Sequence, residues 1–431
     1  MPRPQLTEFM KRIGDDAVAI VPSARETVRS NDTHYRYRQD SDLFYLSGFS
    51  EPESIAVVKP SDKDAPYTLF VRPRDPEREI WDGRRAGVEG AVSEYGADAA
   101  HTYTEFAEKV GELMNNTSNL YYRIGVDADL DQIVIGHLRR LRALGRKGFS
   151  APHTIIDTGA VLHEMRLIKS DEEIANMQRA ADISAAAHVE AMKTARGGMK
   201  EFEIEALLEF SFRKNGAAAP AYTSIVGAGA NATVLHYIEN SGELHDGELL
   251  LIDAGAEFNG YAADITRTFP INGKFNQAQR EIYDLVLEAQ VACCEMVRPG
   301  STNDEIKARS VEILTDGLVR LGLLKGEPAE LIKEEKYKQF YMHGLGHYLG
   351  LDVHDVGRYY HKDQPRRLEP GMVMTVEPGI YISPDTKDIP SEYLGIGVRI
   401  EDDVLVTKNG PRVLTDKVPK TADEIEAVMA R

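Results

Sequence analysis

Cysteine is scarce in this sequence, which has two among 431 residues, side by side at Cys293 and Cys294. Two adjacent cysteines cannot build a disulfide framework, which excludes a disulfide-stabilised secreted domain and is typical of a reducing compartment. Long apolar runs are also missing. No segment reaches the roughly 18 apolar residues of a transmembrane helix, and the N-terminal residues lack the apolar core of a signal peptide. We therefore expect a cytoplasmic protein that does not bind membranes.

Positive charge is in deficit as well. Lysine and arginine number 51 against 69 aspartates and glutamates, so the net charge is -18. This balance repels nucleic acid and anionic lipid, and neither is a predicted partner. The hydrophobic content of 42% and charged content of 28% are ordinary for a globular protein and exclude a disordered or collagen-like chain. At about 150 residues per domain, the length predicts two or three domains.

Residues 1–168 are predicted to form an N-terminal α/β domain. Residues 55–58 and 67–71 are short apolar runs that favour buried strands. Residues 105–114 and 131–141 repeat apolar residues at helical spacing. Strands that alternate with helices in this way indicate a layered α/β arrangement.

Residues 169–431 are predicted to form an α+β domain. It begins at a capping box, Ser170 with Glu173, whose helix ends near Gly197. A second helix is expected over 200–214, and strands over 248–253 and 262–269 are expected to form an antiparallel hairpin turned at 255–260. The same patterns predict helices over 275–297 and 302–322, then strands over 372–377 and 397–406.

Four acids stand where strands should carry apolar residues. Asp253 ends the first strand of the expected hairpin, and Asp264 follows eleven positions later on the returning strand. Glu377 and Glu401 close two later apolar runs. Taken singly, each has an ordinary explanation as a turn aspartate or a solvated strand end. An unpaired buried carboxylate costs several kcal/mol, however, so acids that face each other indicate a bound cation.

Three histidines occur within twelve residues, at positions 343, 347 and 354, although the whole chain has only 12. Neutral imidazole is the commonest nitrogen ligand of metals and the usual proton carrier near neutral pH. Glycines at 344, 346 and 350 allow close backbone approach between them. Together with the four acids, the trio predicts a catalytic metal site.

These residues carry a family resemblance. Asp253, Asp264, His347, Glu377 and Glu401 have the order and spacing of the dinuclear metal ligands of the pita-bread metallopeptidases. Further matches at 36–49, 73–84, 163–170 and His236 extend the resemblance, over most of the chain, to the Xaa-Pro aminopeptidase (aminopeptidase P) family. The resemblance implies a creatinase/prolidase-like α/β domain in front of a pita-bread α+β catalytic domain.

The ligand types agree with that implication. One imidazole and four carboxylates form a hard, oxygen-rich set, which suits a pair of divalent cations about 3.5–4 Å apart. The resemblance implies Mn²⁺, and Zn²⁺ or Co²⁺ suit the same ligands nearly as well.

The implied reaction is release of the N-terminal residue from peptides with proline at the second position, by a hydroxide that bridges the two metals. In that resemblance Glu377 accepts the proton of the attacking water and passes it to the proline nitrogen. His354 binds the substrate carbonyl, and His236 and His343 line the subsites. The free α-amine lies near Asp253. Proline has a tertiary amide and a fixed φ, so it needs a pocket of its own.

Four further residues are candidates around the site. Arg399 lies two positions before Glu401, so in a regular strand both face the same side, and we expect it to orient a carboxylate. Tyr222 and Asp32 match positions that the family uses near the substrate. Trp81, the one tryptophan, either anchors a core or, as the resemblance implies, reaches a neighbouring subunit's site in a homotetramer or homodimer.

Three alternatives remain open from the sequence. A proline dipeptidase (prolidase) would use the same ligands but needs a cation for the carboxylate that follows proline. A methionine aminopeptidase shares the catalytic fold but normally lacks such an N-terminal domain. A non-catalytic binding module on the same fold would be expected to have lost ligands, and all five are present here.

Overall fold

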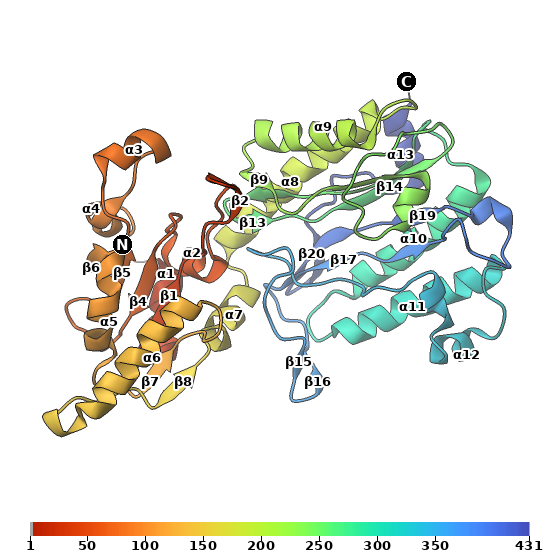
Figure 1. The fold of residues 1–431 in the computed structure, drawn as a ribbon. Helices are drawn as coiled ribbons and strands as arrows, with labels where there is room; N and C mark the ends of the chain where they lie inside the picture. Colours follow the sequence, from red (N-terminus) through yellow and green to blue (C-terminus); the bar gives the residue numbers. More distant parts are fainter. Residues whose placement is uncertain (1–2, 431) are drawn as a thin grey trace. The chain divides into compact units, whose positions relative to one another are not determined.

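The computed structural model describes residues 3–430, and the chain forms two compact units, one ending at Arg166 and one beginning at Leu167. Figure 1 shows both units. Among residues 3–430, no helix combines the length and the apolar character needed to cross a bilayer.

The first unit is built on a mixed six-stranded sheet. Its strand order is β6 (Ala99–Thr102), β5 (Tyr67–Val71), β4 (Ile55–Val58), β1 (Ala17–Pro22), β7 (Asn119–Tyr121) and β8 (Thr154–Ile156). The pairs β1–β4 and β4–β5 are antiparallel, while β5–β6, β1–β7 and β7–β8 are parallel. Both strands predicted in this unit, 55–58 and 67–71, are confirmed, and both are buried along their whole length.

Helices α5 (Phe106–Met114) and α6 (Ala128–Ala143) cover this sheet with their apolar sides, including Val110 and Val134. Helix α6 begins earlier than predicted because the side chain of Asp127 caps it. The other helices of the unit are α1 (Pro4–Ile13), α2 (Ser41–Ser47), α3 (Pro76–Asp82) and α4 (Gly87–Ser93), and α7 (Gly159–Leu167) follows β8. A short hairpin is formed by β2 (Val28–Ser30) and β3 (Thr33–His34).

The second unit repeats one arrangement twice: a helix pair followed by an antiparallel three-stranded sheet. The first copy has α8 (Asp171–Thr194) and α9 (Glu201–Lys214), then β10 (Ile225–Ala228), β11 (Leu249–Asp253) and β14 (Thr266–Pro270). The second has α10 (Gln277–Met296) and α11 (Asn303–Arg320), then β17 (Val373–Val376), β20 (Asp402–Thr407) and β21 (Gly410–Val413). In Figure 1 the strands lie between the two helix pairs.

Capping explains why these helices begin where they do. Ser170 and Glu173 form the predicted capping box of α8. Similar boxes start α10 at Asn276 and α11 at Thr302, so the two long helices predicted there are confirmed. The helices pack around a large apolar core that includes Ile282. The remaining elements of the unit are β9 (Ala219–Pro220), β12 (Ala256–Phe258), β13 (Tyr261–Ala262), α12 (Pro328–Lys333), β15 (Tyr360–His361), β16 (Gln364–Pro365), β18 (Gly379–Tyr381), β19 (Gly397–Arg399) and α13 (Ala422–Met429).

The hairpin predicted over 248–269 was wrong in the position of its turn. Strand β11 does pair with β14, but the chain between them first forms a second hairpin, β12–β13, which belongs to another sheet. Its turn is Asn259-Gly260, with φ of 50° and 82°. Asn-Gly is the pair that such two-residue turns prefer, because both positions need positive φ. Asp264 therefore lies between β13 and β14, not on a returning strand.

The single strand predicted over 397–406 was also wrong. It divides into β19, which pairs with β18, and β20, which pairs with β17. The break at 400–401 moves Glu401 out of regular strand geometry. The strand argument that placed Arg399 and Glu401 on one face therefore does not apply, although both side chains are buried.

Candidate active site and metal centre

The five predicted ligands come from equivalent places in the two copies of the repeat, plus one loop. Asp253 is the last residue of β11, and Asp264 stands just before its partner β14. Glu377 directly follows β17, and Glu401 directly precedes its partner β20. His347 comes from the glycine-rich loop before β17. Paired strand ends thus bring four carboxylates from distant sequence to one place.

Three of these residues lie within metal-binding reach of each other. Ligand atoms of Asp264, His347 and Glu401 all fall within 4.8 Å of one another. Nε2 of His347 is 3.5 Å from Oδ2 of Asp264 and 3.7 Å from Oε1 of Glu377. Asp253 joins the group through Tyr222, whose hydroxyl lies against both aspartates.

The electrostatics of this cluster favour a bound cation. Burial, with the charges of Asp264 and Glu377, raises the pKa of Glu401 well above its usual value. Burial likewise raises the pKa of Asp253, against the opposing effect of Arg399. The pKa of Glu377 rises to about 8, mainly through burial. Burial by itself would lower the pKa of His347, but Asp264 and Glu377 raise it to about 9. Carboxylates so crowded are stabilised when divalent ions replace the protons.

The donor set fits such ions. Nδ1 of His347 lies 3.0 Å from the backbone oxygen of Tyr348, so that nitrogen donates its proton there and leaves the Nε2 lone pair for a metal. The carboxylates of Asp264 and Glu401 supply hard oxygen ligands beside it. Asp253 and Glu377 complete the set of residues that could hold a second ion.

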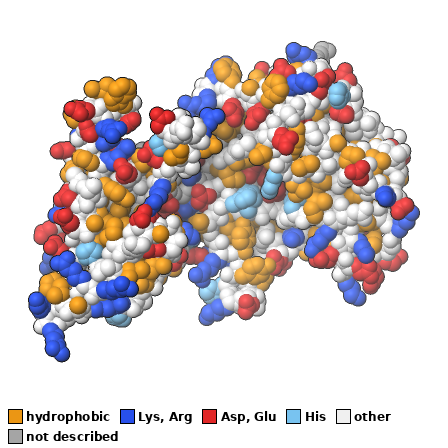
Figure 2. Space-filling model, in the orientation of Figure 1, with side chains coloured by type: hydrophobic (Ala, Val, Ile, Leu, Met, Phe, Trp, Pro, Cys, Tyr) orange, Lys and Arg blue, Asp and Glu red, His pale blue; other side chains and the backbone are white. Residues whose placement is uncertain are grey.

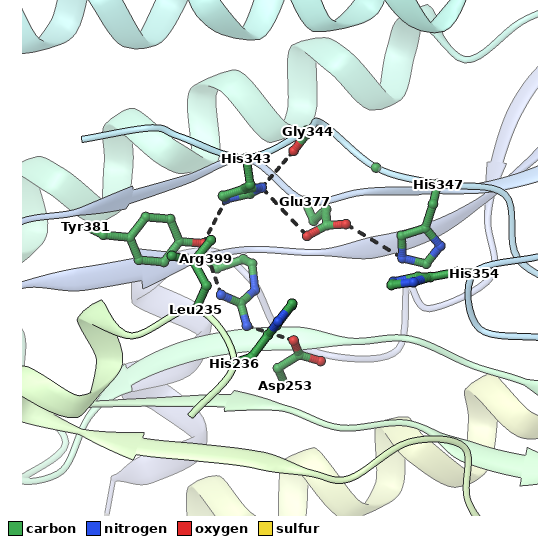
Figure 3. A pocket seen from close by; sticks show the side chains of 11 residues that line it. Leu235, His236, Asp253, His343, Gly344, His347, His354, Glu377, Tyr381 and Arg399 are labelled. Atoms are coloured by element: carbon green, nitrogen blue, oxygen red, sulfur yellow. Dashed lines mark hydrogen bonds and ion pairs between the residues drawn. The ribbon is translucent and has the colours of Figure 1, made fainter. Parts of the chain in front are cut away.

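The cluster opens into a pocket of about 310 Å³ in the second unit. Figure 2 shows histidine side chains, in pale blue, gathered in a hollow on the face of this unit that is turned to the viewer. Figure 3 shows His236, His343 and His354 around the acids, as predicted for residues that touch the substrate. The lining consists of Leu235, His236, Asp253, His343, Gly344, Gly346, His347, His354, Glu377, Tyr381 and Arg399.

A chain of hydrogen bonds sets the protonation of His343 (Figure 3). Nη1 of Arg399 donates to the hydroxyl of Tyr381 at 3.0 Å. That hydroxyl lies 2.9 Å from Nε2 of His343, whose Nδ1 is 2.7 Å from the oxygen of Gly344. Because arginine only donates, Tyr381 donates to Nε2, and Nδ1 carries the imidazole proton. Burial and the charge of Arg399 lower the pKa of His343 to about 4, so the ring is neutral.

His354 is held by the loop that carries it. Its ring meets the ring of His347 edge-on, with centroids 4.3 Å apart. The next residue, Asp355, accepts a hydrogen bond of 2.9 Å from Nζ of Lys169, and both side chains are only 1% exposed. A buried ion pair of this kind fixes the loop because separating the partners leaves a charge unpaired.

Arg399 bonds a carboxylate of the site, that of Asp253, and its predicted orienting role stays a prediction. Nη2 donates to Oδ2 of Asp253 at 2.7 Å, and Nε donates to the hydroxyl of Thr266 at 3.1 Å. Thr266 in turn donates to Oε2 of Glu401 at 2.6 Å. The arginine is 3% exposed, which excludes a surface position.

Tyr222 contacts two predicted ligands. Its hydroxyl donates to Oδ1 of Asp253 at 2.6 Å and lies as close to Asp264. Burial and the charge of Asp253 raise the pKa of Tyr222 well above its usual value, so the group stays a protonated donor. Its position suits it to orient both aspartates, and the substrate contact predicted from the sequence stays a prediction.

Replacing Tyr222 with phenylalanine is expected to weaken Mn²⁺ binding by about 10- to 100-fold, the usual effect of removing a partner that orients a metal ligand. The affinity would be measured by competition with a chelating indicator. Tyr283→Phe is the matched control, because Tyr283 is a buried tyrosine whose hydroxyl bonds the backbone oxygen of Lys420 and none of the predicted ligands. Equal affinity in the two variants would contradict an orienting role for Tyr222.

Two candidates belong to the other unit. Asp32 is exposed in the turn between β2 and β3. Trp81 on α3 is 84% exposed, so it does not anchor a core. The pocket lining comes entirely from residues of the second unit, and the predicted substrate contacts of Asp32 and Trp81 stay predictions.

The sequence interpretation missed several residues that complete the site. Tyr381 and Thr266 resemble ordinary core residues in sequence, and only their bonds to His343, Arg399 and Glu401 give them a function. Asp403 is 1% exposed and accepts the backbone N–H of Asp264 at 3.1 Å. The available signal was the pair of acids that follows Glu401 within an otherwise apolar strand.

Comparison with known proteins agrees with this geometry. A model described as metallopeptidase family M24 matches residues 175–408, and one described as aminopeptidase P, N-terminal domain, matches residues 5–121. The chain is 49% identical to Xaa-Pro aminopeptidase of Escherichia coli strain K12, over 98% of this chain and 95% of the relative. The structure of Pseudomonas aeruginosa aminopeptidase PepP is similar with a TM-score of 0.97, at 48% identity, covering 99% and 96% of the two chains. A zinc-substituted E. coli aminopeptidase P with product gives 0.95 at 46% identity, covering 100% and 98%.

The chain belongs to metallopeptidase family M24 and is a hydrolase. Within that family it is one of the Xaa-Pro aminopeptidases, since the similarity extends over nearly the whole of both chains and includes the N-terminal domain. The predicted fold class, an α/β N-terminal domain with a pita-bread catalytic domain, is confirmed.

Proposed function

We propose that this enzyme removes the N-terminal residue from peptides with proline at the second position, using the pocket around Asp264, His347 and Glu401. The observation that carries the proposal is the convergence of four carboxylates and one imidazole at a pocket that three further histidines line. The relatives that share this architecture bear the name Xaa-Pro aminopeptidase.

Two divalent cations, Mn²⁺ in our proposal, would be held by Asp264, His347 and Glu401 together with Asp253 and Glu377. When bound, such ions supply an acidified water and polarise the scissile carbonyl. The oxygen-rich donor set supports Mn²⁺, and Zn²⁺ and Co²⁺ are compatible with the same ligands.

Glu377 has the position for proton transfer. Its carboxylate lies between two histidines, with Oε1 3.7 Å from Nε2 of His347 and Oε2 4.0 Å from Nδ1 of His343. In the proposed mechanism a carboxylate oxygen of Glu377 receives the proton of the attacking water and delivers it to the proline nitrogen as the amide bond breaks. The proline nitrogen needs this proton because without it the nitrogen would leave as a strongly basic amide anion.

The histidines and Asp253 position the substrate. His354 donates to the oxygen of the scissile carbonyl, where negative charge develops. The neutral ring of His343, with His236 and Leu235, forms the subsite that binds the proline ring. Asp253, oriented by Arg399, receives the free α-amine, which explains why only the N-terminal residue is released.

The same pocket argues against a strict dipeptidase. Prolidase activity needs a cation to bind the carboxylate that directly follows proline. Among the described residues of the lining, Arg399 is the one arginine or lysine, and its guanidinium already bonds Asp253, Tyr381 and Thr266. A longer peptide makes no such demand, because its proline carbonyl continues into a neutral amide.

The test offers both substrate types to metal-free protein reconstituted with Mn²⁺. We expect release of Xaa from an Xaa-Pro-Yaa tripeptide, at a rate that exceeds cleavage of the Xaa-Pro dipeptide. Cleavage of the dipeptide alone would contradict the proposal and favour prolidase. Parallel reconstitution with Zn²⁺ and Co²⁺ ranks the metals by kcat/KM.

We also propose a cytoplasmic location and a homotetrameric or homodimeric state. The two cysteines are free and buried, which supports a reducing compartment. The exposed pair Ile80 and Trp81, at 81% and 84%, supports contact between subunits, because adjoining exposed apolar side chains are typical of protein–protein contact sites. Cell fractionation and light scattering of the purified protein test these two proposals separately.

A further inference from the structure

The segment between β10 and β11 carries His236 into the pocket with little help from regular structure. After β10 ends at Ala228, a short 3₁₀ turn covers 229–233, and the chain is irregular until β11. Near the pocket residues Leu235 and His236, Val234 is 53% exposed and Ile238 is 55% exposed. Tyr237, between His236 and Ile238, packs against a small apolar cluster of Ile225, Ala232 and Leu251. Apart from this small cluster, burial of apolar side chains contributes little to holding the segment in place.

A single buried carboxylate holds the segment between β10 and β11 in place. Glu201, the first residue of α9, is fully buried, and its side chain accepts four hydrogen bonds from this segment. Oε1 accepts from the N–H of Ala228 at 2.7 Å and from Nδ2 of Asn231 at 2.9 Å. Oε2 accepts from the hydroxyl of Tyr237 at 2.8 Å and from the N–H of Gly242 at 2.6 Å.

The four donors are distributed along the whole segment. Ala228 and Gly242 stand at its two ends, Asn231 lies in the 3₁₀ turn, and Tyr237 directly follows His236. The backbone N–H of Glu201 also donates to the oxygen of Gly242 at 3.0 Å. One carboxylate group therefore closes the segment into a loop and ties its middle, next to His236, to the same point.

The chemistry makes this a strong clamp. A buried carboxylate must have its oxygens satisfied, and none of the four donors brings a charge that would neutralise it. The N-terminus of α9 supplies a favourable dipole for the negative charge of Glu201. If the segment moved away from Glu201, the buried charge would lose hydrogen-bond donors. The arrangement in which all four donors bond Glu201 is therefore strongly preferred over arrangements in which some of these bonds are broken.

The residues around the Glu201 carboxylate are tightly packed. A Cβ placed on Gly242 would lie 2.9 Å from Cδ of Glu201, so only glycine fits there. Asn240, fully buried with φ of 45°, accepts from the N–H of Val226 at 2.9 Å and donates to the oxygen of Ser224 at 2.9 Å. These contacts hold the end of the segment near Asn240 against β10.

We infer that Glu201 is a positioning residue for the peptidase reaction: its four accepted hydrogen bonds hold the 228–242 segment so that His236 stands in the substrate pocket. This inference rests on the proposed substrate-binding role of His236. Glu201 contacts none of the five predicted metal ligands, so its effect on substrate binding is separable from metal binding.

The first test needs no substrate. In Mn²⁺-loaded Glu201→Gln protein, hydrogen–deuterium exchange is expected to rise in peptides that cover 228–242 and to stay unchanged in those that cover β17 and β20, because the amide group of glutamine turns N–H groups toward existing donors. The bound metal is expected to stay at the wild-type level. Glu203→Gln is the matched control, since this exposed residue lies two positions further along α9 and glutamine keeps its capping bond to Lys200.

The second test is kinetic. The value of kcat/KM for an Xaa-Pro-Yaa peptide is expected to fall by about 10- to 100-fold in Glu201→Gln, the range for losing hydrogen bonds to a charged group, mainly through KM. In a His236→Ala background, the same substitution is expected to have no further effect on KM, because the positioned group is already absent. Tyr237→Phe removes one donor to Glu201 and keeps the ring, so we expect a smaller fall in kcat/KM, again mainly through KM. If Glu201→Gln does not fold, Tyr237→Phe tests the positioning role of Glu201 instead.

Unchanged exchange in the segment would overturn the clamp itself, whatever the kinetics show. Increased exchange with unchanged KM would overturn its role in substrate binding. Loss of metal from Glu201→Gln, or an effect on KM that persists in the His236→Ala background, would assign Glu201 to general stability instead. A failure of the proposed peptidase function is distinguishable from all of these, because wild-type protein would then show no turnover while the exchange result stands.

Discussion

Asp264→Ala is expected to abolish metal binding and turnover while the fold stays intact. Asp264 lies within 4.8 Å of both His347 and Glu401 through ligand atoms, and it is the residue that links them to Asp253 through Tyr222. Without it, the set of residues that would hold the ions is incomplete. We expect activity to fall by at least about 10³-fold, the upper range for losing one electrostatic contact, because here the ions themselves are lost.

The stability of the metal-free protein separates this role from a structural one. Removing one acid from a buried set of like charges relieves repulsion, so the free energy of unfolding of metal-free Asp264→Ala should equal or exceed that of metal-free wild type. Metal content would be measured by mass spectrometry and stability by urea titration with a chelator present. The same substitution at Asp316, exposed on α11, is the control. Wild-type metal content in Asp264→Ala would contradict the assignment.

Arg267→Met is expected to cause the largest loss of stability, about 3–5 kcal/mol of unfolding free energy, because it leaves a buried charge without its main partner. Arg267 is fully buried and donates to Oδ1 of Asp402 at 2.7 Å. It also donates to the backbone oxygens of Glu401 at 2.6 Å and Thr266 at 2.9 Å. The arginine therefore supports the strand ends on which ligand Glu401 is placed.

A lysine at the same carboxylate provides the comparison. Lys420 donates to Oδ2 of Asp402 at 2.8 Å, but its side chain is 25% exposed, so water replaces part of what is lost. Lys420→Met is expected to cost about 1 kcal/mol. Both variants would be unfolded in urea without metal, so that ion binding does not contribute. If Arg267→Met costs no more than Lys420→Met, the burial argument fails.

The two wrong strand predictions show that the hydrophobic pattern predicts which residues are buried but not which strands pair. Residues 397–406 have apolar residues on both sides of the acids at 401–403, but β19 and β20 pair with different partners, β18 and β17. Hydrophobic alternation reports burial, and both strands are buried, so the change of partner leaves no mark on the pattern. The Asn259-Gly260 turn was readable, because that pair favours a two-residue turn, and it would have moved the hairpin to its correct place.

In the site, too, some functional residues are recognisable in the sequence and others only in the structure. Acids at strand ends and clustered histidines are conspicuous because they contradict the apolar pattern around them. Glu201 and Arg267 carry no such signal: a glutamate at a helix start and an arginine in a strand have ordinary surface explanations. Only the burial of both side chains and the identity of their partners, far away in sequence, reveals their tasks.

The sequence by itself determined the helix starts, through capping residues such as Ser170, and the chemical type of the centre, through residues whose polarity is too costly to bury without a cation. Local hydrogen bonding and desolvation decide both, and neither needs a distant contact. The tertiary structure alone decided which strand ends meet, which hydroxyl and guanidinium groups orient the ligands, and which buried carboxylate holds the substrate segment. Those depend on pairings between residues far apart in the chain, and no local pattern encodes a partner.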